Sequence, residues 1–176
     1  MEERIEEQCR NVVGLPDDAG EIDIPTAEFN IVYQLSHLMH HFFDEGIGLR
    51  QIVDHYYLLR TTKFADSHDW KEELDYLGLR KFAGAVMYVM QEVFALETDY
   101  LLVSADERRG KLLLYEILKG GNFGQHSGLT RHSTGIKYFL KIRRSLRFVR
   151  EYPAEALCEP IFRTWHFFWR LKHRGT

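Results

Sequence analysis

The sequence contains little cysteine and no long apolar run. Its two cysteines, Cys9 and Cys158, are far apart and form no metal-binding or redox motif. No apolar run approaches the roughly 18 residues that a membrane-spanning helix needs. The first ten residues, MEERIEEQCR, are acidic and polar, unlike a secretory signal. We therefore expect a protein of the reducing cytoplasm that has no membrane partner.

The chain is nevertheless rich enough in apolar residues to fold. Over 176 residues, 45% are hydrophobic and 14% are aromatic, which suits one domain with a core of its own. Helical periodicity dominates, and the alternating strand–helix order of a parallel sheet is absent. We predict a mainly α fold, a multi-helix bundle of about six or seven helices. Residues 1–25 form a lead-in segment with a small β-hairpin, and residues 26–176 form the helical domain.

The stretch Phe29–Arg60 is predicted to organise the fold as two helices joined at Gly46-Ile47-Gly48. The first helix is apolar on most sides, which predicts that it is buried. Its polar residues step by three or four along one stripe: Asn30, Gln34, His37, His41 and Asp44. Partners for a buried polar stripe could come from the second helix, either from Arg50 and Asp54 or from Gln51 and His55. Such a seam is either a structural network or one wall of a site, and periodicity does not choose between them.

Further helices follow. We predict an amphipathic helix over residues 79–96, then a helix that begins at a capping box, Ser104-Ala105-Asp106-Glu107. The residues from 120 to 135 form the longest predicted loop. The helix after this loop is expected to bury an apolar stripe: Phe139, Ile142, Leu146 and Val149. A last helix is predicted from about Ala154 to Lys172.

Charge is divided unevenly along the chain. Residues 1–100 contain 20 acidic and 8 basic side chains, whereas residues 101–176 contain 6 and 15. Much of the positive charge lies on the helix between Lys137 and Arg150. Such a helix can bind nucleic acid or an acidic surface. We favour a solvated face with basic side-chain stems covering the core, and we do not expect nucleic acid as a partner.

The pattern of histidines, then GIGLRQ, then an aspartate in a second helix resembles the helical C-terminal half of an uncharacterised bacterial nucleotidyltransferase family. The matching residues are His37, His41, Gly46, Gly48, Leu49, Arg50, Gln51 and Asp54, with later similarity at residues 77–79 and 120–124. The resemblance implies transfer of a nucleoside monophosphate from a nucleoside triphosphate to an unknown acceptor. It also implies that a nucleotide or acceptor substrate lies at the helical hairpin, where we expect His37, His41, Arg50 and Asp54 to contact it.

The catalytic signature of such enzymes is a Gly-Ser followed by paired aspartates on a strand, which hold magnesium. This sequence has no Gly-Ser, and its nearest acidic pair, Glu21 and Asp23, lacks that context. We therefore expect a family member's C-terminal portion, which has no catalytic residues of its own, is inactive alone and uses magnesium only together with a catalytic half.

Other interpretations of the same residues remain open. His37, His40 and His41 have spacings seen in metal sites, but no further ligand is identifiable, and we assign no metal site. Arg50 and Asp54 could instead form an intrahelical ion pair. Arg50 and His55 have the Arg-x4-His spacing of small all-helical ribonucleases of the HEPN type, which use the histidine as acid or base. A non-enzymatic interaction domain is the third alternative.

Overall fold

The computed structural model describes residues 11–14, 16, 19–62, 69–120 and 134–173. These residues form seven α-helices and one two-stranded sheet, which confirms the predicted mainly α fold with its N-terminal hairpin. The elements are β1 (Asn11–Gly14), β2 (Glu21–Ile24), α2 (Ala27–Asp44), α3 (Leu49–Thr61), α4 (Trp70–Tyr76), α5 (Arg80–Phe94), the 3-10 turn η2 (Thr98–Tyr100), α6 (Glu107–Gly120), α7 (Thr134–Leu146) and α8 (Pro153–Lys172). The predicted loop at 120–135 falls almost entirely outside the described residues.

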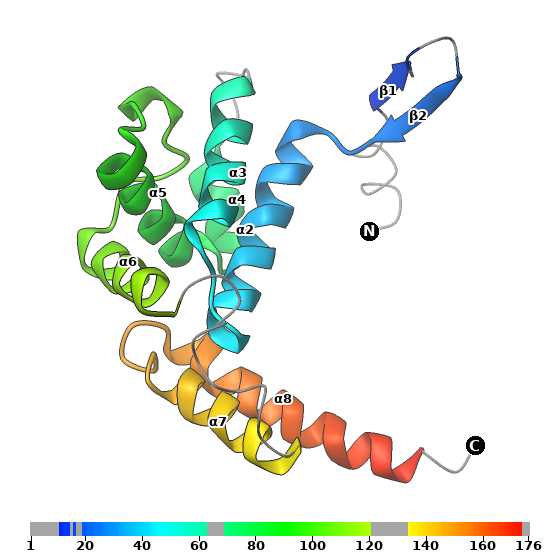
Figure 1. Cartoon of the computed structure of the whole chain (residues 1–176), viewed down its shortest axis with the longest axis vertical. Helices are drawn as coiled ribbons and strands as arrows, with labels where there is room; N and C mark the ends of the chain where they lie inside the picture. Colours follow the sequence, from blue (N-terminus) through cyan, green and yellow to red (C-terminus); the bar gives the residue numbers. More distant parts are fainter. Residues whose placement is uncertain (1–10, 15, 17–18, 63–68, 121–133, 174–176) are drawn as a thin grey trace.

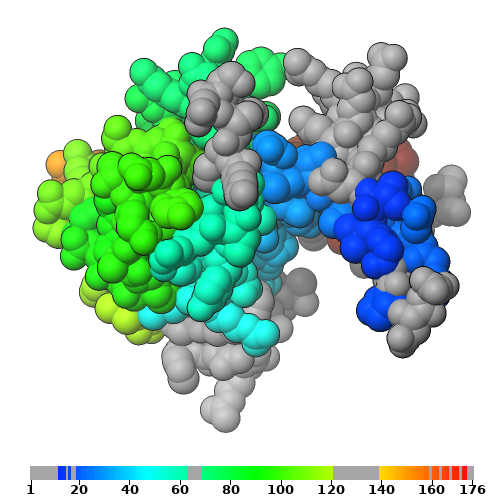
Figure 2. Space-filling model, turned by 90° about the horizontal axis from the view of Figure 1, so that it is seen from above, coloured from blue at the N-terminus to red at the C-terminus, as the bar shows by residue number. Residues whose placement is uncertain are grey.

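The hairpin stands apart from the helices. β1 and β2 pair antiparallel, from Asn11 opposite Ile24 to Gly14 opposite Glu21. Its side chains Val12, Val13 and Ile22 are exposed. Figure 1 shows the hairpin projecting beyond the N-terminal end of α2, and Figure 2 shows it on the side of the molecule opposite α5 and α6. A two-stranded hairpin without a packed face is weakly stable by itself.

The turn between α2 and α3 forms where the glycines predict it. The hydroxyl of Thr26 caps the start of α2 by accepting from the backbone N–H of Phe29 at 3.2 Å. Gly46 has φ +96°, in the left-handed region that only glycine adopts freely. The backbone N–H of Gly48 donates to Oε1 of Gln51 at 2.6 Å, which closes the first turn of α3. The Gly-Ile-Gly segment is therefore a helix-to-helix connection.

The core lies around α5 and the inner faces of its neighbours. The amphipathic pattern predicts a buried face of Phe82, Val86, Val89, Met90 and Val93, and all of these residues are buried except Val93, which is exposed. An aromatic cluster continues the core toward the C-terminal helices, with the ring centroid of Phe42 4.6 Å from that of Phe148 and 5.8 Å from that of Phe82. Figure 1 shows α7 and α8 lying across the end of the bundle at which α2 finishes.

The predicted buried stripe of α7 is wrong. Phe139, Leu146 and Val149 are exposed, and the buried residues of this segment are Ser145 and Phe148. The reason is that α7 turns its basic face, and not its apolar stripe, toward the neighbouring helices. α7 packs against the C-terminal end of α2, and its basic face meets the acidic and carbonyl groups there. The stems of these side chains cover apolar surface.

The predicted capping box at the start of α6 is also misplaced. The side chain that caps this helix is Asp106, whose Oδ1 accepts from the backbone N–H of Arg109 at 3.0 Å. α6 accordingly begins at Glu107 and not after Ser104. Within the described residues, no helix has the length and apolar character needed to cross a membrane.

Candidate functional site

The polar seam between α2 and α3 consists mainly of one buried hydrogen bond. Nδ1 of His55 lies 3.1 Å from Oε1 of Gln34, and His55 is completely buried. Burial lowers the pKa of His55 to about 3, because a charged imidazole would lose its hydration there. His55 is therefore neutral near pH 7 and acts as a structural link between the two helices.

The histidine part of the stripe is at the surface and not in the interior as predicted. His37 is exposed and His41 is half-buried, with ring centroids 4.4 Å apart in an edge-to-face arrangement. Nδ1 of His41 lies 3.9 Å from a carboxylate oxygen of Glu45. Burial and the neighbouring His37 lower the pKa of His41, and these effects outweigh the opposing influence of Glu45. The two predicted histidines thus adjoin each other on one face of α2.

Arg50 and Asp54 lie on the outer face of α3. Both are exposed, and they do not form the intrahelical ion pair considered for them. Arg50 stands in the first turn of the helix, two residues after the cap at Gly48. Its guanidinium has no carboxylate partner among the described residues, so its charge is open to an anionic ligand.

The ribonuclease alternative finds no support in this geometry. Arg50 is exposed, whereas His55 is completely buried. An acid or base must come within hydrogen-bond reach of the group whose proton it transfers. His55 cannot meet an RNA phosphate while α2 and α3 are packed as they are.

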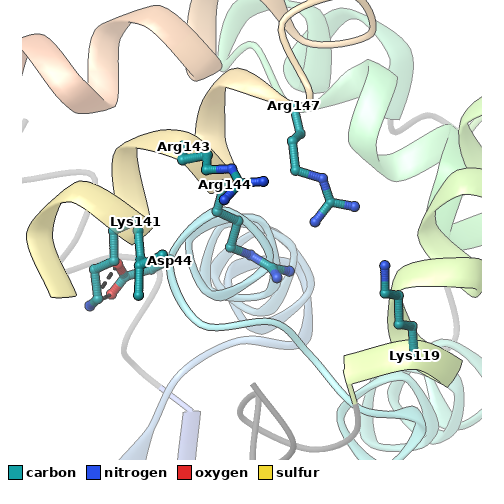
Figure 3. A pocket seen from close by; sticks show the side chains of 7 residues that line it. Asp44, Lys119, Lys141, Arg143, Arg144 and Arg147 are labelled. Carbon is teal, nitrogen blue, oxygen red and sulfur yellow. Dashed lines mark hydrogen bonds and ion pairs between the residues drawn. The ribbon is translucent and has the colours of Figure 1, made fainter. Parts of the chain in front are cut away.

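A second polar feature lies at the junction of α2, α6 and α7. A cavity of about 400 Å³ is lined there by seven of the described residues: Asp44, Lys119, Leu140, Lys141, Arg143, Arg144 and Arg147. Five of these side chains are basic. Figure 3 shows Lys119 reaching in from α6, and Arg144 and Arg147 from the opposite side. We call this cavity the basic pocket.

Several cations of the basic pocket also fasten α7 to its neighbours. Nζ of Lys141 lies 2.8 Å from the Asp44 carboxylate of α2. Arg144 donates from Nε and Nη2 to the backbone carbonyl of Phe42 at 3.2 and 3.1 Å. Arg147 donates to the buried carboxylate of Glu116 at 2.6 Å. Charge-assisted contacts therefore hold this end of the fold together with the aromatic cluster around Phe42 and Phe148.

Sequence reasoning identified only part of this pocket. The uneven charge and the basic helix at 137–150 indicate four of its cations. The sequence alone, however, favours placing these side chains on a solvent-exposed face and not in a pocket. Lys119 lies more than twenty residues upstream, and no motif links it to α7. That the backbone carbonyl of Phe42 accepts hydrogen bonds from this pocket cannot be predicted from any sequence motif. Only the packing of α7 against α2 and α6 brings these groups together.

The fold and its polar features together define a helical domain with a helical hairpin, α2 and α3, and a basic pocket. Residues 8–95 match the family described as uncharacterised nucleotidyltransferase, and the chain belongs to that family. This confirms the family inferred from the GIGLRQ segment. No curated protein and no solved structure matches the chain.

The segment that matches the family model is not the same stretch of chain as the one in which we noted the resemblance. It begins in the lead-in segment, contains the hairpin and α2 to α5, and stops at residue 95. The similarity expected at residues 120–124 lies beyond it. His37, His41, Arg50 and Asp54 all fall inside the match, whereas the basic pocket's five cations lie beyond it, one on α6, three on α7 and Arg147 just after α7.

Proposed function

We propose that this chain is the substrate-facing helical portion of a nucleotidyltransferase that moves a nucleoside monophosphate from a nucleoside triphosphate to an acceptor. The observation that carries the proposal is the family match, which contains the complete α2–turn–α3 unit. The Gly-Ser of the catalytic signature is absent from the sequence, and the nearest acidic pair, Glu21 and Asp23, lacks the context of that signature. On this proposal the chain binds substrate but does not by itself transfer the nucleotide.

Arg50 is the residue that we expect to contact the triphosphate. It is exposed, and it forms no ion pair with a described residue. A guanidinium can hold two phosphate oxygens at once through parallel N–H groups. His37 and His41, adjoining on α2, and Asp54, one turn beyond Arg50, would face the acceptor or the phosphates from the same hairpin.

Magnesium does not fit the residues present. Among the described residues, no group of three or more His, Cys, Asp or Glu side chains is placed to hold a metal ion. We therefore derive no step through magnesium for this chain. A metal held by a separate catalytic half is compatible with the proposal.

The test is nucleotide binding by the whole chain, measured by isothermal titration calorimetry with ATP, GTP, CTP and UTP in turn. We expect at least one nucleotide to bind, and Arg50→Ala to raise its Kd about tenfold, equivalent to about 1.4 kcal/mol. Because Arg50 is exposed and unpaired within the described residues, its loss should change stability by less than about 0.5 kcal/mol. Circular dichroism melts of both proteins check this.

The matched control is Arg170→Ala, which removes another exposed arginine, this one from α8. We expect it to leave the Kd unchanged. A nucleotide that binds equally well to the wild type and to Arg50→Ala would refute the assigned role of Arg50. Failure of all four nucleotides to bind would contradict the proposed function itself.

A further inference from the structure

The basic pocket contains more positive charge than the surrounding protein neutralises. Lys141 is paired with Asp44 and lies 3.8 Å from Glu45, and Arg144 and Arg147 share Glu116. Lys119 and Arg143 have no carboxylate partner among the described residues. Lys119 instead lies against the ring of Tyr115, 5.5 Å from its centroid.

Hydrogen-bond donors in the pocket are likewise in excess. A guanidinium has five N–H donors, and Arg144 directs donors from only two of its nitrogens, Nε and Nη2, to the carbonyl of Phe42. Its side chain is only 17% exposed, and that of Glu116 is 4% exposed. Burial lowers the pKa of Arg144, and so does Arg147, while Glu116 opposes both effects. An anion that entered the pocket would therefore meet partly dehydrated cations, which bind anions more strongly than fully solvated ones do.

The shape of the site favours a small ligand over a nucleic acid strand. Nucleic-acid grooves combine a basic track along the backbone with aromatic platforms for the bases. Here Lys119 and Arg147 instead point toward each other across one cavity (Figure 3), which Arg143 and Arg144 also line. Its volume of about 400 Å³ falls within the usual range for small-molecule sites and exceeds what a single phosphate ion would fill. None of the described residues that line it has an aromatic ring.

We propose that the basic pocket binds a chain of two or three linked phosphates, either free or as part of a small molecule. Lys119 and Arg143 supply the unneutralised charge, and Arg144 and Arg147 supply donors from the pocket wall. The phosphate oxygens would take the place of water on these groups through charge-assisted hydrogen bonds. This site is separate from Arg50, and the inference goes beyond the proposed function.

The test is calorimetric titration of the full chain with inorganic pyrophosphate, inorganic triphosphate and ATP, without added metal, at 0.1 M NaCl. The test variant is the double substitution Lys119→Ala with Arg143→Ala. Neither side chain has an ion pair with a described residue, so both can be removed without breaking a contact that fastens α7. We expect pyrophosphate and triphosphate to bind the wild type, and the double variant to raise both Kd values at least tenfold.

The matched control is Arg170→Ala with Lys172→Ala, which removes two exposed cations from α8 and changes the net charge equally. Its Kd values should equal those of the wild type. Equal weakening in the control would mean that only overall charge attracts the anion, which overturns the proposal. Undetectable binding of both inorganic ligands, or unchanged binding in the double variant, also overturns it.

Two further arms identify the ligand. If ATP competes with triphosphate for the pocket, the phosphate chain can belong to a nucleotide; if it does not, the ligand is the free phosphate chain. A 12-nucleotide RNA that binds more tightly than triphosphate and depends on the same two cations would replace the proposal with a nucleic-acid interface. The titrations are repeated in the Arg50→Ala background, where the double variant should still raise both Kd values at least tenfold, so the failure of either proposal can be recognised separately.

Discussion

The imidazole of His55 on α3 is joined to the side-chain amide of Gln34 on α2, with Nδ1 and Oε1 3.1 Å apart. Since an amide oxygen can only accept, Nδ1 carries the hydrogen. Nε2 is then a bare acceptor, buried and without a hydrogen-bond donor among the described residues. The link fixes the spacing of the two helices that carry the proposed substrate residues, and a proton added at Nε2 would bury a charge without a hydrogen-bond partner among the described residues.

Because of the low pKa of His55, the free energy of unfolding should decrease progressively as the pH falls. The pKa of His55 is about 3 in the folded state, below the ordinary value of 6.5 that it regains on unfolding. The unfolded state thus binds a proton that the folded state does not. This contribution to stability is complete above about pH 6.5 and falls as the pH drops toward 3. The expected slope is about 1.4 kcal/mol per pH unit, measured by urea denaturation between pH 7 and pH 4.

His55→Gln provides the comparison, because glutamine can keep a hydrogen bond to Gln34 but does not titrate. It should be less stable than the wild type at pH 7 and lose less stability on acidification. His40→Gln, which replaces an exposed imidazole on α2, should follow the wild-type curve. Parallel pH curves for His55→Gln and the wild type would count against this assignment.

The helical hairpin could be predicted from sequence because its signals are local. Thr26 caps α2, the glycines at 46 and 48 form the turn, and Gln51 closes the next helix, all within a few residues of one another. The face that α7 buries could not be predicted in this way. Its apolar stripe has the right period, but the partner surface at the end of α2 is polar. The basic face was therefore the one that packed.

The candidate site residues likewise fall into a group that local sequence predicts and a group that it does not. Arg50 and the two histidines were recognisable because they form part of a family pattern within one stretch of chain. The basic pocket depends on contacts between residues about a hundred positions apart, such as Arg144 with the carbonyl of Phe42. A sequence pattern records the charge of such residues but not what they approach.

Close packing of α5 and α6 should make Gly110 intolerant of any side chain. A Cβ at this position would overlap the side chain of Tyr88. We expect Gly110→Ala to destabilise the fold by about 2 kcal/mol, because the overlap outweighs the gain in helix propensity. Thermal and urea melts measure the change. Gly120→Ala, at the open end of the same helix, meets nothing within 4 Å and should be neutral or slightly stabilising. Equal effects of the two substitutions would show that α5 and α6 are not packed as closely as described.

Glu116 should be the most important carboxylate for holding α7 in place. Its side chain is 4% exposed and lies 2.6 Å from Arg147 and 3.7 Å from Arg144. Glu116→Ala would leave two neighbouring cations without their shared counter-charge, and we expect a loss of about 2–3 kcal/mol in the free energy of unfolding. Glu107→Ala, which breaks an exposed pair with Lys111 on the same helix, should cost only about 0.3–0.5 kcal/mol. A similar small loss for both variants would contradict the buried role of Glu116.

The cap of α6 distinguishes the structure from the sequence prediction directly. The sequence pattern assigns the capping hydroxyl to Ser104, whereas the structure has the Asp106 carboxylate accepting from the backbone N–H of Arg109 and, at 2.6 Å, from its guanidinium. Asp106→Ala should therefore destabilise the protein by about 1 kcal/mol, the usual cost of losing an N-cap. Ser104→Ala should remain within about 0.5 kcal/mol of the wild type. Urea melts at pH 7 measure both. The reverse order would restore the capping box at Ser104, and it would shift the start of α6 toward the N-terminus.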